Sequence, residues 1–443
     1  METYKANRLG TEPVEKLLFS MCSQTTLSLL VYSLYSLTDT FFVSRGVGTL
    51  AAAGVSISSP LIIALGAVST TVGAGGASVV SRALGSRDVE KASKTVANAF
   101  IIFWTAAILV SIFGLIFLDT IIYAMGSTEN IAPYAMGYGK IILIGALTST
   151  GFSAIVRADG NIKYSTAMWL IPVGVNIALD PLFIYVFKWG VEGAAIATVV
   201  GQAISAGMSI YFFFFKKGRP YDIKAGFLIP DKEIIKEIIM IGSPSFLKNI
   251  SSSIIVIITN NLLKNLGGDS ALGIYAIVGR LYSGLSMPQV GIMQGMQPIV
   301  GYNYGLREYS RVNKVLKLSA NASVAYGFLA CILCLAFPAL LLSIMSEDPS
   351  IISSGASVLR MVSLANPLAG VVLMITAYFQ AAGKALKAVA LSFGGILAVR
   401  IPVLLIMAIA FKLNGIWLSE AVSEVVLCIA AVMMLVRYQK SLA

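Results

Sequence analysis

The sequence has no histidine, few charged residues and no polar stretch long enough to form a soluble domain. Of its 443 residues only 12% are charged, and the mean hydropathy is +0.85. Soluble domains carry about 25% charged residues, so this chain cannot cover a water-exposed surface of its size. A soluble enzyme, a nucleic-acid-binding module and a disulfide-stabilised scaffold are therefore excluded, and a lipid bilayer is the solvent that the composition fits.

The sequence also has few residues that could bind a metal or form disulfides, with four cysteines and no histidine. Cys331 and Cys334 have the spacing of a metal site, but no second pair or histidine completes it. We expect these two, together with Cys22 and Cys428, to be buried free thiols in apolar runs. The loop acids that a membrane enzyme would need, such as Asp159, are interspersed with Arg and Lys. We therefore expect neither enzymatic activity nor a bound cofactor.

Twelve hydrophobic runs are each long enough to cross a bilayer as a helix of about 20 residues. They predict an all-α integral membrane protein with twelve transmembrane helices and short loops. The runs are 17–43, 50–80, 95–118, 131–155, 164–187, 191–215, 234–263, 271–300, 315–345, 351–380, 386–411 and 414–436.

Lysine and arginine are unequally distributed between the two sets of loops. Most of the 32 lie in the terminal segments and in the loops after every second run, whereas the opposite loops hold only Arg45, Lys188, Lys264 and Lys412. Cytoplasmic loops carry the excess of Lys and Arg, so this bias predicts that both termini are cytoplasmic. It also explains the net charge of +11 without a nucleic-acid partner. We expect a multi-pass protein of the cell membrane.

The two halves of the chain look alike at a shift of about 220 residues. Gly48 falls on Gly268, and Gly75 falls on Gly295. Each half holds an even number of spans, so both share one orientation and are related by a pseudo-two-fold axis along the membrane normal. This layout is typical of transporters. We predict a six-helix lobe over 1–215, a cytoplasmic linker over 216–233 and a second six-helix lobe over 234–443.

Polar residues of the first lobe gather at one predicted depth. Asp39 lies about one turn inside the outer end of its span, and Asp180 and Thr198 lie about two turns inside theirs. Asn176 precedes Asp180 by four residues and shares its helix face. Such oxygen ligands suit a hard cation such as Na⁺, or hold protons. The alternative is that the acids lie at a wet interface or pair with a buried base, for which Lys140 is the nearest candidate.

Charged residues also lie inside the spans of the second lobe. Glu420 and Glu424 are four residues apart on one helix face, and Arg400 lies in the preceding span. One interpretation is a structural ion pair, and the other is a secondary site for protons or a cationic substrate. Three further bases are expected to face the bundle or to snorkel toward the interface: Lys248, Arg280 and Arg360.

The eighth hydrophobic run is rich in methionine and glutamine between Pro288 and Pro298. These residues favour a bent, adaptable, semi-polar surface, which suits either a promiscuous cavity or ordinary helix packing. Tyrosines of the first and tenth runs are candidates for stacking against an organic cation. The candidate cavity residues are Tyr32, Tyr35, Met287, Gln289, Met293, Gln294 and Tyr378.

Two stretches carry specific motifs. The first contains Arg157-Ala158-Asp159-Gly160-Asn161 and Asn176-Ile177-Ala178-Leu179-Asp180-Pro181, and the second is Gly295-Met296-Gln297-Pro298-Ile299-Val300-Gly301-Tyr302-Asn303-Tyr304-Gly305. With these stretches, nearly the whole chain resembles the multidrug and toxic compound extrusion (MATE) family in its prokaryotic branch.

This resemblance implies a two-lobed exporter of cationic and amphiphilic compounds that is driven by Na⁺ or H⁺. The sequence departs from the family at Gln24, where many members have proline, and at Ser44, where glycine is usual. A proton-driven bend of the first span around that proline is therefore not expected. The family's cation site maps onto Asp39, Asn176, Asp180 and Thr198.

We therefore predict an alternating-access exporter that works as a monomer in membrane lipid on small, cationic organic substrates. Na⁺ or H⁺ is the coupling ion, and where it is Na⁺, the four residues of the cation site are its ligands. The alternative is a lipid-linked sugar flippase with the same two lobes. Such a protein needs cations for a pyrophosphate, and the candidates are Arg280, Arg360 and Arg400.

Overall fold

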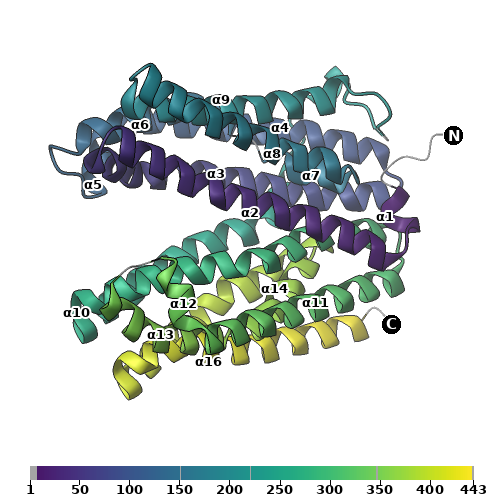
Figure 1. Ribbon diagram of the computed structural model, residues 1–443. Coiled ribbons are helices and arrows are strands. Elements are labelled where there is room, and N and C mark those ends of the chain that lie inside the picture. The colour runs from purple at the N-terminus through teal and green to yellow at the C-terminus, as the bar shows by residue number, and fades with distance from the viewer. Residues whose placement is uncertain (1–6, 150, 220, 346–347, 442–443) are drawn as a thin grey trace. The chain divides into compact units, whose positions relative to one another are not determined.

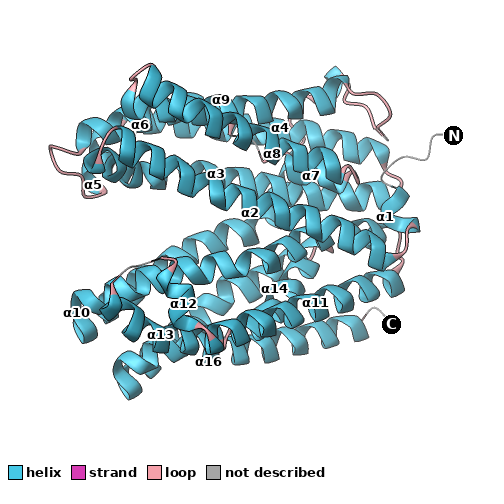
Figure 2. Ribbon diagram, viewed as in Figure 1, coloured by secondary structure: helices cyan, strands magenta, loops and turns pink. Residues whose placement is uncertain are grey.

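The computed structural model describes residues 7–149, 151–219, 221–345 and 348–441 (Figure 1). Within these ranges the chain forms helices and short connections, without a β-strand (Figure 2). In the described residues each of the twelve predicted spans is mainly helical, so the predicted all-α class is confirmed. Residues 1–6, which belong to the amino-terminal segment predicted to be cytoplasmic, lie outside the described residues.

Helices of the first half are joined by short loops, and several continue into a short 3-10 or π-helical turn. They are α1 (Arg8–Thr11), α2 (Val14–Gly46), α3 (Thr49–Gly85), α4 (Val89–Ile116), α5 (Leu118–Ala124), α6 (Ala132–Ile144) with η2 (Gly145–Thr148), α7 (Ser153–Ala158), α8 (Ile162–Pro181) with η3 (Leu182–Val186), and α9 (Gly190–Ile210) with η4 (Tyr211–Phe215).

In the second half, the elements are η5 (Ala225–Phe227), α10 (Lys232–Gly305), α11 (Tyr309–Ala336), α12 (Pro338–Ser343), α13 (Pro349–Ser363), α14 (Asn366–Ala381), α15 (Ala385–Val389), η6 (Ala390–Gly394), η7 (Ile396–Arg400) and α16 (Ile401–Lys440). Helix α10 contains two predicted spans, and α16 contains the end of one span and the whole of the next. The backbone leaves helical geometry between these spans at Gly268 (φ 62°) and at Lys412 (φ 51°).

Contacts divide the chain into two compact units that do not follow its linear order. The first unit comprises Met1–Thr11 and Leu27–Gly242, and the second comprises Glu12–Thr26 and Ser243–Ala443. The start of α2 therefore packs within the second unit, and the start of α10 packs within the first. The predicted linker, 216–233, lies within the first unit.

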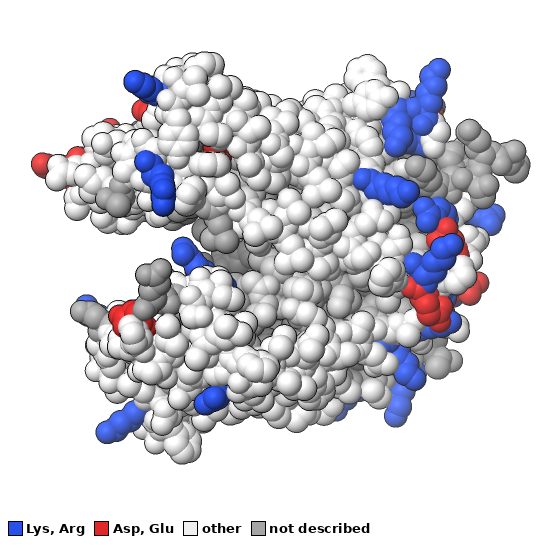
Figure 3. All heavy atoms as spheres, viewed as in Figure 1, with Lys and Arg blue, Asp and Glu red and all other residues white. Residues whose placement is uncertain are grey.

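The surface and length of the helices fit a membrane. In the described part of the chain nine helices are long and apolar enough to cross one, or ten when α13 and α14, which are bent by 44°, count as one span. On the face drawn in Figure 3, charged side chains gather toward the ends of each unit and leave a broad uncharged band between them. Lipid offers no hydrogen-bond partners, and in helices the backbone N–H and C=O groups bond to one another within the same segment.

The duplication is visible in the backbone itself. Residues with positive φ recur at the same places in both halves and form four pairs. The pairs are Gly48 (120°) with Gly268 (62°), Arg87 (62°) with Arg307 (63°), Gly160 (76°) with Gly383 (74°), and Lys188 (56°) with Lys412 (51°). Because such residues end helices, both halves place their helix boundaries by one plan.

In the first unit, the start of α10 packs against α3 through glycines. A Cβ atom at Gly75 would collide with the carbonyl oxygen of Ile238, and one at Gly242 would collide with the carbonyl oxygen of Thr71. The missing side chains let the two helix backbones touch, as small residues do in membrane helix pairs. We call this the α3–α10 contact.

The second unit repeats this contact with the start of α2. A Cβ atom at Gly295 of α10 would lie 2.8 Å from the Cα atom of Cys22. Gly295 corresponds to Gly75, and Cys22 corresponds to Gly242, at the shift of 220 that the sequence shows. We call this the α2–α10 contact. Each half of the duplicated chain thus exchanges the beginning of its first span with the other unit.

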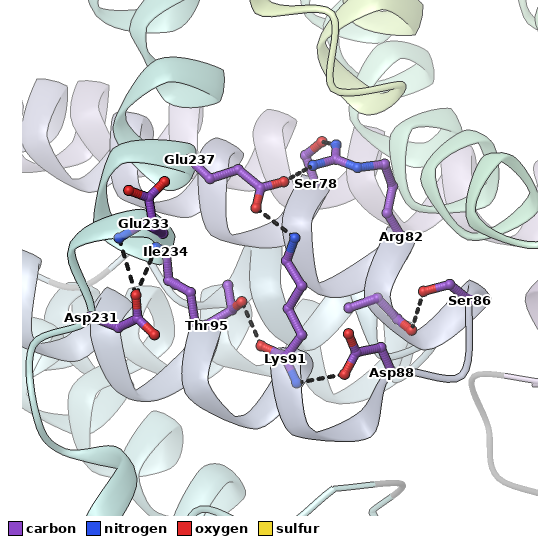
Figure 4. Close-up of polar contacts among 11 residues, drawn as sticks. Ser78, Arg82, Ser86, Asp88, Lys91, Thr95, Asp231, Glu233, Ile234 and Glu237 are labelled. Atoms are coloured by element: carbon purple, nitrogen blue, oxygen red, sulfur yellow. Dashed lines mark hydrogen bonds and ion pairs between the residues drawn. The ribbon is translucent and has the colours of Figure 1, made fainter.

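Ion pairs hold the exchanged segments at their polar ends. Glu237 of α10 accepts from Arg82 of α3 at 2.8 Å and from Lys91 of α4 at 2.7 Å (Figure 4). In the second unit, Glu15 of α2 pairs with Lys314 of α11 at 2.7 Å. The Glu15–Lys314 pair is exposed and contributes little stability, so the close backbone approach is the stronger restraint at the α2–α10 contact.

Adding one methyl group at either contact tests this packing. We expect Gly75→Ala and Gly295→Ala each to lower the free energy of unfolding by about 1–3 kcal/mol, because the methyl group must displace neighbouring backbone atoms. Gly207→Ala in α9 is the control, since its Cβ atom meets nothing within 4 Å and alanine favours a helix. Thermal unfolding of the purified protein in detergent measures the change. Equal stability of Gly75→Ala and Gly207→Ala would contradict the packing.

Candidate functional site

Three helices of the first unit bring polar side chains into its interior. Asp39 comes from α2, Asn176 and Asp180 come from α8, and Thr198 comes from α9. Each side chain is less than a tenth exposed. A Cβ atom at Gly201 would lie 3.1 Å from the carbonyl oxygen of Pro172, so α9 approaches α8 closely just below Thr198.

Hydrogen bonds connect α8 with α9 at this point. The Asn176 amide bonds best with its nitrogen donating to Asp180 Oδ2 at 3.1 Å and its oxygen accepting from the Thr198 N–H at 3.1 Å. The hydroxyl groups of Thr198 and Tyr35 of α2 lie 3.2 Å apart. One connected set of polar groups therefore spans all three helices.

Among the residues that the structure describes, the two acids have no basic partner. Within the described residues, Asp39 Oδ1 and Asp180 Oδ1 are buried and accept no hydrogen bond. The two carboxylates lie close enough to interact electrostatically, and no Lys or Arg in the described part of the chain interacts with either of them. Lys140, the base considered from the sequence, has an exposed side chain and forms no ion pair with them. The arrangement therefore leaves negative charge in a region of low dielectric constant.

These oxygen atoms fit a hard cation. Carboxylate, amide and hydroxyl oxygens are the ligands that such an ion prefers, and the set contains two of the first kind. A proton suits the same place, because two neighbouring carboxylates in a dry environment favour sharing one. The chemistry that this set supports is binding and release of a small cation.

Two tyrosines complete the surroundings. Tyr35 was predicted as a cavity residue, and the structure places its hydroxyl against Thr198. Tyr138 of α6 is buried, lies within hydrogen-bonding reach of Thr198 and interacts electrostatically with Asp39 and Asp180. Tyr138 is not among the residues predicted from the sequence, because a lone tyrosine in an apolar run carries no signal that separates a polar role from packing.

The other cavity candidates differ in their placement. Tyr32 is half-exposed and its ring lies 5.2 Å from that of Trp169. Gln289 is buried in the second unit and donates to the carbonyl oxygens of Ser323 at 3.1 Å and Asn366 at 3.0 Å. Its amide is therefore used in helix packing. Tyr378 is buried as well, and three candidates remain partly exposed: Met287, Met293 and Gln294.

The charges of the second unit form ion pairs with one another. Arg400 donates to Glu420 Oε1 at 2.9 Å and also to Glu424 Oε1. The ion-pair interpretation of these residues thus describes their geometry. Arg360 donates through Nε to the carbonyl oxygen of Leu335 at 3.2 Å, near the end of α11.

Long apolar helices that enclose a set of polar side chains are typical of membrane transporters. The MatE family model matches residues 25–182 and 244–406, which is most of the chain. The chain therefore belongs to the MatE family of transporters, and the resemblance found in its motifs is confirmed. It is a multi-pass membrane transporter that is related to multidrug export proteins.

Among curated relatives, the multidrug export protein MepA of Staphylococcus aureus (strain MRSA252) is 26% identical over 431 residues, covering 96% of this chain and 94% of MepA. MepA of Staphylococcus haemolyticus (strain JCSC1435) is 26% identical over 425 residues, covering 93% of this chain and 92% of that protein. Both likenesses extend over the two halves of the duplication.

Solved structures share the fold. A MATE transporter in complex with MaL6 aligns with a TM-score of 0.93 at 23% identity, covering 99% of both chains. A MOP-superfamily transporter of Pyrococcus furiosus, described as having a binding pocket of reverse polarity and a different function, also aligns with a TM-score of 0.93 at 23% identity, over 100% of this chain and 99% of that one. The twelve-helix, two-lobe fold is thus shared, but a shared fold does not determine which substrate is transported.

Replacing one buried acid by its amide tests whether the carboxylate lacks a cationic partner. In sodium-free alkaline buffer, we expect Asp180→Asn to raise the free energy of unfolding by about 1–3 kcal/mol, because burying a neutral amide costs less than burying an unpaired carboxylate. Asp119→Asn, at an exposed position of α5, is the control and should leave stability unchanged. Thermal unfolding in detergent measures both. A loss of stability in Asp180→Asn would show that the carboxylate has a cationic partner.

Proposed function

We propose that this protein is a cation-coupled exporter of small, cationic and amphiphilic organic compounds from the cytoplasm across the cell membrane. The observation that carries the proposal is the pair of buried carboxylates, Asp39 and Asp180, without a basic partner among the described residues. The MepA proteins, which are multidrug exporters by name, support the substrate class. The excess of Lys and Arg in one set of loops supports cytoplasmic termini.

Coupling arises from a difference in cation affinity between two conformations. An empty site keeps two negative charges in a dry environment, which is unfavourable, and a Na⁺ or H⁺ ion neutralises part of this charge. The conformation that holds the oxygens together in a dry environment gains most from the cation. Loading the site therefore shifts the balance between the outward-open and inward-open states, as alternating access requires.

Each polar residue has a distinct role in this proposal. Asp39 and Asp180 hold the cation, and Asn176 positions Asp180 through its amide. Thr198 links α9 to Tyr35 of α2, so that α2 and α9 approach together when the site is loaded. Where the cation is Na⁺, the amide and hydroxyl oxygens are further ligands. Where it is H⁺, the two carboxylates share it.

The flippase alternative is less well supported. Two of the three arginines proposed for a pyrophosphate are engaged: Arg400 pairs with two glutamates, and Arg360 donates to a carbonyl oxygen. Only Arg280 is then left from that set. Binding of a fluorescent organic cation, with no binding of a lipid pyrophosphate, separates the two functions.

Efflux driven by one imposed gradient at a time tests the proposal. In proteoliposomes loaded with a fluorescent organic cation, we expect Asp39→Asn and Asp180→Asn to reduce gradient-driven export about tenfold or more, because they remove the charge that senses the cation. A pure Na⁺ gradient and a pure pH gradient are applied separately, and the one that drives export by the unsubstituted protein identifies the ion.

Asp119→Asn is again the matched control and should export normally, since its side chain is exposed. Binding of the organic cation to the Asp39→Asn protein, measured by fluorescence, shows that this variant is folded. Undiminished export by both site variants would refute the coupling role of the two acids.

A further inference from the structure

A cluster of charges in the second unit has no part in the function proposed above. Arg400 lies at the end of η7, and Glu420 and Glu424 lie one turn apart in α16, beyond the break at Lys412. Glu424 is 1% exposed, whereas Arg400 and Glu420 keep about a quarter to a third of their side-chain surface accessible, at 25% and 31%. The edge of the cluster is therefore accessible, whereas Glu424 is enclosed.

One guanidinium serves two carboxylates in this cluster. Arg400 Nη1 donates to Glu420 Oε1 at 2.9 Å, and Nη2 donates to Glu424 Oε1. The second oxygen of Glu424, Oε2, is buried and has no hydrogen-bond partner among the described residues. Three charges thus leave one negative charge in excess, next to a buried oxygen atom that has nothing to neutralise it.

Lys248 of α10 is placed to supply the missing charge. It lies four residues after Pro244 and three before Ser251, and it shares a helix face with these two buried residues. Its ammonium interacts electrostatically with Glu424 and Arg400. It nevertheless forms no ion pair within the described part of the chain, and its side chain is exposed. The compensating cation is near Glu424 but not bound to it.

We propose that Glu424 is a second proton site, at which a proton and the Lys248 ammonium compete for Oε2. In the conformation described here the proton is on Oε2, and Lys248 forms no ion pair. When the proton leaves for the water at Glu420 and Arg400, the carboxylate binds the ammonium and ties α10 to α16. The other titratable groups that interact with Glu424 are Tyr282 of α10 and Cys428 of α16.

This site goes beyond the proposed function, because it lies in the second unit and has no residue in common with the site that contains Asp39 and Asp180. It gives the second unit its own response to protons, and this response acts on α10. The start of α10 also makes the α3–α10 contact in the first unit. A change at Glu424 therefore acts on a helix that belongs to both units.

Infrared difference spectroscopy of the reconstituted protein tests the site. Acid-induced difference spectra report protonated carboxyl groups, and we expect Glu424→Gln to lack one buried carboxyl component that the unsubstituted protein shows at neutral pH. Glu420→Gln is the matched control: it removes the half-exposed carboxylate beside the same arginine and should keep the component. A spectrum of Glu424→Gln identical to that of the unsubstituted protein would overturn the proposal.

A second variant leaves the carboxyl group in place and tests the competition. In Lys248→Met, the component should persist to a pH about one unit higher or more, because the competing cation is gone. Lys248→Arg should titrate like the unsubstituted protein. Equal titration of Lys248→Met and the unsubstituted protein would contradict the competition.

The same spectra separate this site from the first one. In the double variant Asp39→Asn/Asp180→Asn, the Glu424 component should remain unchanged, whether or not export is lost. Its loss there would assign the component to the first unit and reject the second proton site.

Discussion

Negative charge buried without a basic partner is the constraint on which the rest of this transporter depends. A fold that only needed stability would neutralise Asp39 and Asp180 with Lys or Arg, or replace them with apolar residues. The second unit shows that the chain can do the former, because Arg400 pairs with both Glu420 and Glu424. The acids of the first unit lack such a partner among the described residues. In the proposed function, this cost is offset by a cation that binds to the acids and leaves them in each transport cycle.

The exchange of helix segments connects this constraint to the architecture. The start of α2 packs in the second unit through Cys22, whereas Asp39, on the same helix, lies in the first unit. In the proposed function Asp39 binds the cation, and α2 connects this acid with the close glycine contact at the other end of the helix. The equivalent helix, α10, is anchored in the first unit and carries Lys248. Each unit thus contains a long helix whose first part belongs to the other unit.

The sequence predicted the helices, their number and the repeat, because apolar runs, charge bias and glycine spacing are local properties of the chain. The predicted depth of the polar residues also selected Asp39, Asn176, Asp180 and Thr198. In the structure, Asn176 is hydrogen-bonded to both Asp180 and Thr198. The sequence could not show the segment exchange, which depends on contacts between distant residues. Tyr138 was missed and Gln289 was misleading for the same reason: the residue type does not reveal whether a polar group faces a site or a neighbouring carbonyl.

Counting bound cations is the most direct test of the central claim. Purified protein and the Asp39→Asn/Asp180→Asn double variant are compared in weak buffer, with proton uptake followed by a pH electrode and sodium binding followed with radioactive Na⁺. We expect the unsubstituted protein to bind about one more Na⁺ or H⁺ per molecule than the double variant, because the paired carboxylates bind it as a unit. Equal uptake of both ions by the two proteins would contradict the claim that these acids hold the coupling cation.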